Sequence, residues 1–282
     1  MQAAGSTVAT LFAIDSLQAE VSFLGVASGD ASSNEAIIWT RALDATVPVG
    51  SLVTAQVSAD PAFGTILAAA SGTPSAVKDY TIKFDIKGLV AGTQYYYRFQ
   101  GPNGETSIQG TFKTAPDAQT AAPVRFAFSG DCDGKMRPYP LTRGFDTLNL
   151  DFFSFIGDTE YETASTGSPA VTSTDSATKA QLFSQFSRKY REQFGPVTPG
   201  GQNGLQTFFA SQGNFTLMDN HELGNKRYMN GGAPAGGAIT TDPVNLPTGK
   251  GFAGTTADGV DVNTTGTFLN KAAGFQTLEQ VY

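Results

Sequence analysis

Short runs of alternating apolar and polar residues fill the chain from Val21 to about Thr114, and they predict β-strands throughout this stretch. Asp, Gly, Pro and Ser residues separate the runs, which is the spacing expected of a β-sandwich. The clearest strand candidates are Ala36–Thr40, Leu52–Val57, Tyr80–Ile86 and Gln94–Gln100.

A tyrosine-rich segment in the same stretch refines this prediction. Gly88 to Phe99 combines a leucine, a glycine turn and an alternating tyrosine strand, which resembles the tyrosine-corner region of fibronectin type III domains. A carbohydrate-binding or peptide-binding role is the functional interpretation of these tyrosines. Their alternation favours packing in the core and at the corner. Trp39 is a candidate core residue of the same sandwich.

A short linker of small residues, bounded by prolines, divides the chain at 117–123. Before it lie a lead segment (1–20) and the predicted sandwich domain (21–116). After it, residues 124–282 alternate strand-like and helix-like patterns, which is typical of an α/β domain. The sequence therefore predicts two domains of different class.

Helical spacing is clearest in Ala177–Phe194, where Leu182, Phe183, Phe186, Tyr190 and Phe194 form an aromatic stripe expected to pack in the core. Leu141–Leu150 and Leu269–Tyr282 are further predicted helices. Residues 224–267 are rich in Gly, Asn, Thr and Pro, and such a long irregular stretch is typical of a lid or mobile loop.

Three predicted strands of the second domain each end in a polar loop. The strands are Val124–Phe128, Phe152–Ile156 and Asn214–Met218. In open α/β sheets the carboxyl ends of the strands are where ligands bind, so the sequence predicts one metal site built from successive strand ends. The loops supply Asp131 and Cys132 after the first strand, Asp158 and Tyr161 after the second, and Asn220 and His221 after the third.

These side chains suit a phosphoryl-transfer site with two metal ions. A carboxylate such as Asp158 can bridge two cations, and a phenolate such as Tyr161 can bind trivalent iron, whereas zinc and magnesium sites do not ordinarily recruit tyrosine. Asn220 offers an amide oxygen, and His221 can protonate a leaving oxygen or hold the attacking water. Two metals a few ångströms apart would clamp a phosphoryl group and generate hydroxide.

The acidic composition limits the classes of partner. A net charge of −7 and a pI near 4.7 argue against non-specific binding to nucleic acid or anionic membranes. An acidic protein that acts on anionic phosphates needs bound cations to invert its local field. A single cysteine cannot form a disulfide framework. The chain contains no run of eighteen apolar residues, so the sequence predicts no membrane-spanning helix. Residues 1–20 are either the trimmed end of an export signal or an ordinary amphipathic lead-in.

Several motifs of the sequence resemble those of the PhoD-like alkaline phosphatases, which are calcineurin-type metallophosphoesterases with an N-terminal fibronectin-like domain. The motifs are GVASGD, IIWTR, GLVAGTQYYYRF and TFKTAP in the first domain, and GDTEYE and MDNHELGN in the second. The resemblance spans 22–282. It implies an iron–calcium site, with zinc, manganese or magnesium as alternative second metals. It also implies hydrolysis of phosphomonoesters or phosphodiesters by a metal-activated hydroxide in a secreted or periplasmic protein.

The resemblance also assigns individual residues. Asp158 and Tyr161 fall on the family's bridging aspartate and iron-binding tyrosine, and Asn220 and His221 fall on its metal-binding strand-end motif. One departure concerns the cysteine ligand that follows a serine in that family, because this chain has Ser129-Gly130-Asp131-Cys132 instead. Either Asp131 or Cys132 can be the ligand. A carboxylate there would resemble the related purple acid phosphatases, as does the N-H-E form of the third motif.

A second departure concerns the late part of the chain. Calcineurin-type sites draw further histidine and aspartate ligands from late strands, but His221 is the only histidine here. We therefore expect a C-terminally incomplete chain that holds the first half of the catalytic domain, with an incomplete metal site and little or no activity. The missing half would then be a partner. The alternative from another class is a non-catalytic cell-surface or matrix-binding protein on a degenerate phosphatase scaffold.

Overall fold

The computed structural model describes residues 20–47, 49–161, 164–165, 168–171, 179–195 and 204–217. No helix in this part of the chain has the length and hydropathy of a membrane-spanning segment. Most of the regular structure is β-sheet. The strands are β1 (Val21–Gly29), β2 (Glu35–Asp44), β3 (Val53–Ser58), β4 (Ala68–Gly72), β5 (Thr81–Lys87), β6 (Gln94–Gln100), β7 (Gly110–Lys113), β8 (Phe126–Ser129), β9 (Phe152–Phe155) and β10 (Gly213–Thr216), and the α-helices are α1 (Lys179–Phe194) and α2 (Gly204–Ala210).

The first seven strands form a β-sandwich, as the alternating pattern predicts. One sheet has the order β4-β3-β6-β7, and β5-β2-β1 form the facing layer, with antiparallel pairing within each group. The four predicted strands are confirmed as β2, β3, β5 and β6, with ends within a few residues of the prediction. Apolar side chains from both layers fill the interior, among them Val26, Ile38, Val57, Phe99 and Phe112.

The tyrosines of β6 pack as predicted from their alternation. Tyr95 and Tyr97 are 2% and 0% exposed and lie in the sandwich core. The Tyr95 hydroxyl accepts a hydrogen bond of 2.8 Å from the backbone N–H of Val90, in the turn that precedes the strand. This contact is the tyrosine corner that the segment resembles in sequence.

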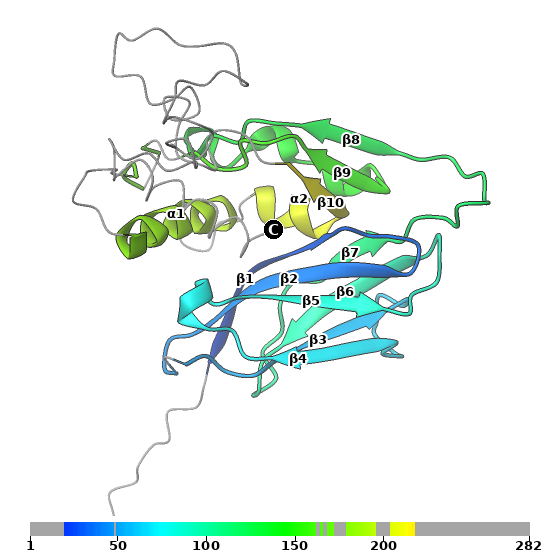
Figure 1. The fold of residues 1–282 in the computed structure, drawn as a ribbon, viewed down its shortest axis with the longest axis horizontal. Coiled ribbons are helices and arrows are strands. Elements are labelled where there is room, and N and C mark those ends of the chain that lie inside the picture. The colour runs from blue at the N-terminus through cyan, green and yellow to red at the C-terminus, as the bar shows by residue number, and fades with distance from the viewer. Residues whose placement is uncertain are drawn as a thin grey trace, which may run out of the picture.

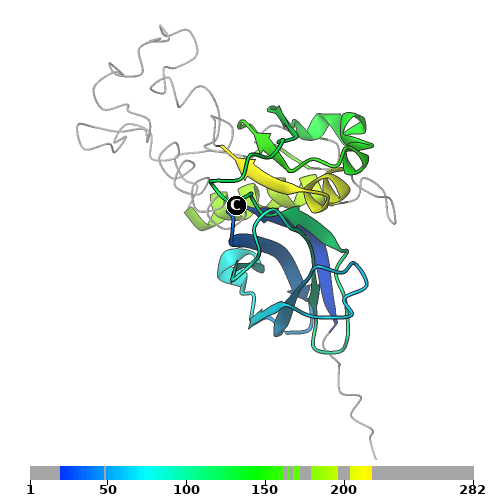
Figure 2. The same cartoon turned by 90° about the vertical axis from the view of Figure 1, so that its right-hand side faces the viewer.

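One sheet runs continuously from the sandwich into the second part of the chain (Figure 1). Its order is β5-β2-β1-β10-β9-β8. β10 pairs in parallel with β1 through Ser28–Gly213 and Gly29–Asn214, and β10, β9 and β8 are parallel to one another. Figure 2 shows the sandwich strands, which run from blue through cyan to blue-green, joined at one end to the green and yellow elements of the second part. The linker at 117–123 therefore does not separate the two parts in space.

The GVASGD motif (Gly25–Asp30) lies where the sandwich strands join the parallel strands of this sheet, at the pairing of β1 with β10. The pairing of β1 with β2 shifts register between Phe23 and Val26, where Gly25 has φ +84°. A Cβ at Gly25 would meet the Phe194 ring at 3.0 Å, so both the backbone conformation and the close approach of α1 require glycine there. The Asn214 amide donates to the Ser28 carbonyl at 3.2 Å, across the pairing of β1 with β10.

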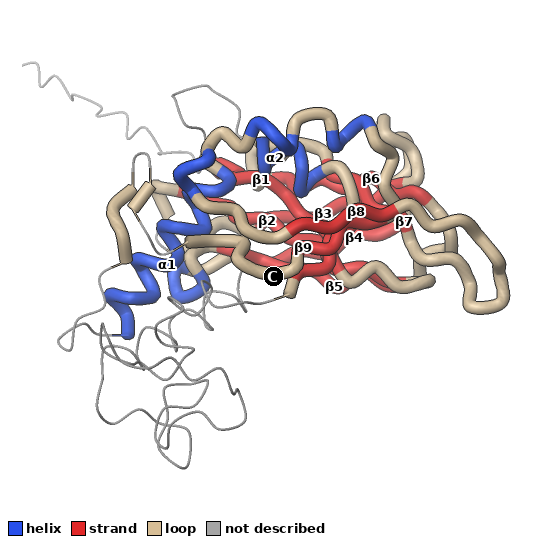
Figure 3. Tube along the Cα trace, turned by 90° about the horizontal axis from the view of Figure 1, so that it is seen from above, coloured by secondary structure: helices blue, strands red, loops and turns tan. Residues whose placement is uncertain are grey.

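Trp39 is buried, but it does not pack in the sandwich interior as predicted. It lies on the outer face of β2, where its ring stacks at a tilt on Phe194 of α1 with centroids 5.2 Å apart. Side chains alternate along a strand, so Ile38 points into the sandwich and Trp39 points toward the helices. Figure 3 shows α1 and α2 beside the strands, and both helices contribute side chains to one core.

These helices and the sheet enclose a second core. It is strongly aromatic and contains Trp39, Tyr139, Phe153, Phe155, Tyr190, Phe194, Leu205, Phe208 and Phe209. The predicted aromatic stripe of α1 is confirmed at Phe186, Tyr190 and Phe194, which are buried, whereas Phe183 is half-buried and the Leu182 side chain lies outside the described part of the structure. Two buried cores thus share the β1–β2 layer as a common wall.

The predicted helix at Leu141–Leu150 is wrong. Two short 3-10 turns occupy that stretch, at Pro140–Thr142 and Phe145–Thr147. Tyr139 and Gly144 precede the turns with φ of +55° and +86°, and these left-handed residues interrupt any continuous right-handed helix. The helix covering this side of the sheet is instead α2, which the hydrophobic pattern did not predict.

Candidate functional site

The loops after β8 and β9 are joined backbone to backbone. The N–H groups of Ile156, Asp131 and Cys132 donate to the carbonyls of Ser129, Gly157 and Asp158 at 2.8, 3.2 and 2.8 Å. These bonds continue the parallel pairing past the strand ends, so the two loops leave the sheet side by side. Asp131 and Asp158 lie in adjacent loops at one rim, as the strand-end rule predicts.

Both aspartates occupy left-handed turns. Asp131, Gly157 and Asp158 have φ of +60°, +99° and +53°. Aspartate tolerates this region better than most residues, and glycine adopts it without penalty. The Gly-Asp pair after β9 therefore turns the chain sharply at the sheet edge, and the Asp158 side chain is buried there with the residue only 4% exposed.

Tyr161 brings the two carboxylates together. Its hydroxyl donates to Asp158 Oδ2 at 3.2 Å, and the carboxylate of Asp131 also lies close enough to interact with it. Burial, followed by the negative charges of Asp158 and Asp131, raises the pKa of Tyr161 above its ordinary value of 10.0. The phenol is therefore protonated in this arrangement, and a bound multivalent cation would oppose the shift.

The donor set suits hard cations. Two carboxylates and a phenolic oxygen are oxygen ligands, which ferric iron and calcium prefer, and the phenol adds the preference for trivalent iron. No group of three His, Cys, Asp or Glu side chains with metal-binding geometry occurs in the described part of the chain. Cation binding here would thus depend on Tyr161 and on ligands beyond the described residues.

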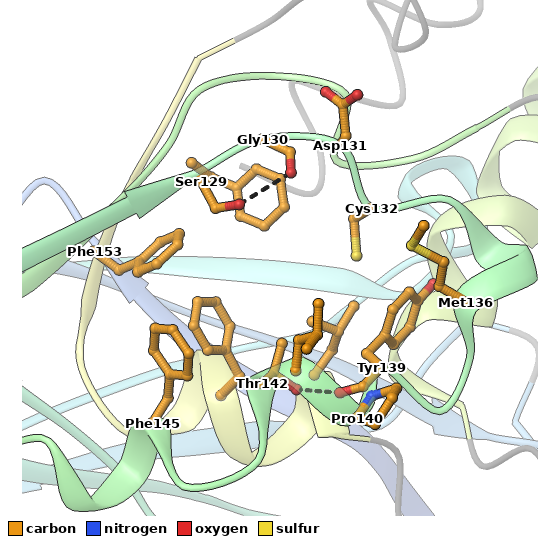
Figure 4. A pocket seen from close by; sticks show the side chains of 14 residues that line it. Ser129, Gly130, Asp131, Cys132, Met136, Tyr139, Pro140, Thr142, Phe145 and Phe153 are labelled. Carbon is orange, nitrogen blue, oxygen red and sulfur yellow. Dashed lines mark hydrogen bonds between the residues drawn. The ribbon is translucent and has the colours of Figure 1, made fainter.

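Cys132 faces away from this oxygen cluster. In Figure 4 the Asp131 carboxylate points out of the pocket on one side of the loop, and the Cys132 thiol points into it on the other. Burial raises the pKa of the thiol to about 12. The carboxylate of Asp131, rather than the Cys132 thiol, lies beside Tyr161, and the thiolate is the form of cysteine that binds metal.

The pocket below Cys132 is apolar. It encloses about 370 Å³ between the ends of β8 and β9, the 3-10 turns and α2 (Figure 4). Two exposed apolar side chains, Met136 and Leu141, line it together with buried ones. Its remaining lining residues include Ser129, Tyr139, Phe145, Phe153, Phe155, Leu205 and Phe208.

The third pair of predicted ligands, Asn220 and His221, lies outside the described residues. The last described residue of that segment is Leu217, whose N–H donates to the Phe155 carbonyl at 2.8 Å. β10 is parallel to β9, so the chain leaves it at the edge that also carries Asp131 and Asp158.

Several charged residues near the candidate site are buried. Arg137 has a side chain only 7% exposed and pairs with Glu192 at 3.7 Å. Lys189 and Glu192 lie between aromatic positions of α1 in sequence, yet both are buried. Glu160 is fully buried, so it does not face solvent. Lys135 and Arg143 are exposed.

Comparisons with known proteins bear out the resemblance to PhoD-like phosphatases. Residues 9–116 match the family model described as the PhoD-like phosphatase, N-terminal domain. Among solved structures, the one titled "Structure of PhoD" matches with a TM-score of 0.66 and 21% sequence identity, over 92% of this chain. The match covers 45% of that chain. At this identity the likeness shows a common fold.

The other structural matches are partial. The fn3 domain of human contactin 1 has 17% identity and a TM-score of 0.28 over 43% of this chain and 99% of that one. The sensor domain of the anti-sigma factor RsgI4 from Pseudobacteroides cellulosolvens has 15% identity and a TM-score of 0.27 over 34% of this chain and 95% of that one. No curated protein matches the chain in sequence.

Proposed function

We propose that this chain, whose residues 9–116 match the PhoD-like phosphatase N-terminal domain, is part of a metal-dependent phosphoric ester hydrolase. The observation that carries the proposal is the convergence of Asp131, Asp158 and Tyr161 at the ends of two adjacent parallel strands. Oxygen donors gathered at the carboxyl edge of such strands suit a metal site for phosphoryl groups.

Each residue has a proposed role. Asp158 would serve as a carboxylate ligand of the cations and Tyr161 would hold ferric iron, while Asp131, in preference to Cys132, would be the first carboxylate ligand. Asn220 supplies an amide oxygen, and His221 orients the attacking water or protonates the leaving oxygen. The cations, proposed as Fe³⁺ and Ca²⁺, supply Lewis-acid stabilisation of charge at the phosphoryl group when bound. The substrate class is phosphomonoesters or phosphodiesters, and the location is secreted or periplasmic.

An exposed aromatic face supports the idea that a further layer of protein belongs on this sheet. Phe126, Phe128 and Phe215 are 54%, 66% and 36% exposed on the face opposite the helices. Phe152 stacks on Phe126 with centroids 5.2 Å apart and contacts Phe215 edge-on at 5.3 Å. A contiguous apolar patch of this kind typically marks an interface. We propose that the other half of the catalytic domain, on a longer chain or as a separate partner, covers it.

Phosphatase assays on two forms of the protein test the proposal. Turnover of p-nitrophenyl phosphate with iron and calcium would be measured for the 282-residue chain and for a C-terminally extended version. We expect a visible tyrosinate–iron charge-transfer band in both forms and clearly higher turnover in the extended form. An extended protein that is colourless, metal-free and inert would refute the enzyme and favour the non-catalytic binding protein on a degenerate scaffold.

A further inference from the structure

A buried cluster of charged residues lies beside the two loops that carry the candidate ligands. We define it as the Glu192 cluster: Arg137, Ser165, Lys189 and Glu192. The side chains of Arg137, Lys189 and Glu192 are 7%, 2% and 5% exposed. Buried charges are costly unless they are paired, so a cluster of this kind needs a structural or functional reason.

The Glu192 carboxylate contacts two other segments of the chain and Lys189 of its own helix. Its Oε1 accepts a hydrogen bond from the Ser165 hydroxyl and lies 3.7 Å from Arg137 Nη1. Its Oε2 accepts from Lys189 Nζ at 3.3 Å, and Lys189 Nζ also reaches Ser165 Oγ at 3.2 Å. Arg137 belongs to the segment that follows Asp131, and Ser165 to the segment that follows Tyr161. One carboxylate on α1 therefore ties both segments to the helix.

The segment after Asp131 is also pressed directly against this carboxylate. A Cβ built on Gly134 would meet Glu192 Oε1 at 2.6 Å and Ser165 Cβ at 3.0 Å. Arg137 Nη2 donates to the Gly195 carbonyl at 3.0 Å, which fastens the same segment to the end of α1. The positions of the two segments are thus set by contacts to one rigid element.

We propose that Glu192 is a positioning residue for the metal site. It acts through Arg137 and Ser165 to fix the loops of Asp131 and Tyr161 relative to each other, and it does not touch the metal itself. Groups that orient metal ligands in this way typically change metal affinity when they are replaced. This inference rests on the proposed function, since it presumes that Asp131, Asp158 and Tyr161 bind a cation.

Iron titration of two variants tests the role. Glu192→Gln keeps the shape of the side chain but removes the charge that Arg137 and Lys189 face. Gly134→Ala keeps every charge and pushes the segment away from Glu192, and Gly134 does not occupy a left-handed conformation that alanine would resist. The readouts are the intensity and position of the tyrosinate–iron band and the iron dissociation constant, with far-UV circular dichroism to verify folding. For both variants we expect affinity to fall roughly 10- to 100-fold.

A matched charge removal at the surface serves as the control. Glu35→Gln removes a carboxylate from an exposed pair with Lys87 at 3.7 Å and is expected to leave iron affinity unchanged. If the wild type forms the band and both cluster variants keep wild-type affinity, the positioning role is overturned while the metal site stands. If the wild type itself shows no band after iron loading, the metal-site proposal fails and takes this inference with it.

Discussion

At the scale of single residues, the loop after β8 offers two candidate ligands that point in opposite directions. Asp131 lies beside Tyr161, whereas the Cys132 thiol is buried in the apolar pocket with its pKa raised to about 12. A thiol with that pKa is overwhelmingly protonated at neutral pH and is a poor ligand until it loses its proton. Of these two adjacent residues, Asp131 therefore belongs to the candidate site and Cys132 to the apolar core.

We predict that Asp131→Asn lowers the iron affinity and that Cys132→Ser does not. Asp131→Asn removes a negatively charged oxygen donor and should weaken iron binding by at least about tenfold, because replacing even outer-shell partners of a metal has effects of that size. Cys132→Ser should leave iron affinity and the tyrosinate–iron band within about twofold of wild type, at some cost in stability. Equilibrium titration followed in the visible range measures both. The reverse pattern, with loss of the band only in Cys132→Ser, would make the cysteine the ligand.

At the scale of elements, the sequence identifies strands well where side chains alternate and poorly where they do not. β2 and β6 alternate inward and outward residues, and both are found as predicted. β4 reads Ala-Ala-Ala-Ser-Gly, which carries no periodic signal, and its place is set by pairing with β3. Trp39 was wrongly predicted to lie in the sandwich core. The alternation of side chains along a strand shows that the two faces of the strand differ, but it does not show which layer packs on each face.

The candidate site was likewise predictable in part from the sequence. Its backbone frame was predictable, since Gly157-Asp158 directly follows an apolar strand and strand ends gather at one rim. The Glu192 cluster was not predictable, because Arg137, Ser165 and Glu192 are distant in sequence and no pattern links them. Their association depends on how α1 packs against the loops.

At this scale we also predict that the tyrosine corner contributes measurably to sandwich stability. Tyr95→Phe removes the hydroxyl that accepts from Val90 N–H and leaves the ring in the core. The free energy of unfolding should fall by about 1 kcal/mol, as is typical of one lost hydrogen bond. Urea unfolding followed by far-UV circular dichroism provides the measurement. Tyr96→Phe is the control on the same strand, because the half-buried Tyr96 hydroxyl makes no side-chain hydrogen bond within the described residues; equal losses in both variants would contradict the prediction.

At the scale of the whole molecule, the sandwich and the part of the chain after the linker share one continuous sheet, and the β1–β2 layer separates their two cores. The β1–β10 pairing, the Trp39–Phe194 contact and Asp79, which pairs with Arg41 at 3.1 Å and with Arg191 at 2.5 Å, all cross between them. Arg191 lies on α1, so the helix is held by an ion pair at its surface and by aromatic packing beneath. The sandwich thus supports β10 and α1, which in turn contact β9 and the segment that follows Asp131.

The single tryptophan reports on this junction, and we predict that Phe194→Ala shifts its emission to longer wavelength. The substitution removes a ring that is 2% exposed and packs on Trp39, so stability should fall by about 3–5 kcal/mol. Because the sheet is continuous, tryptophan fluorescence and far-UV circular dichroism should still report one coincident unfolding transition at the lower stability. Phe126→Ala, on the exposed face of β8, is the control and should cost much less. Two separated transitions would show that the sandwich unfolds independently of the second part, and the shared sheet would then contribute little to holding the site.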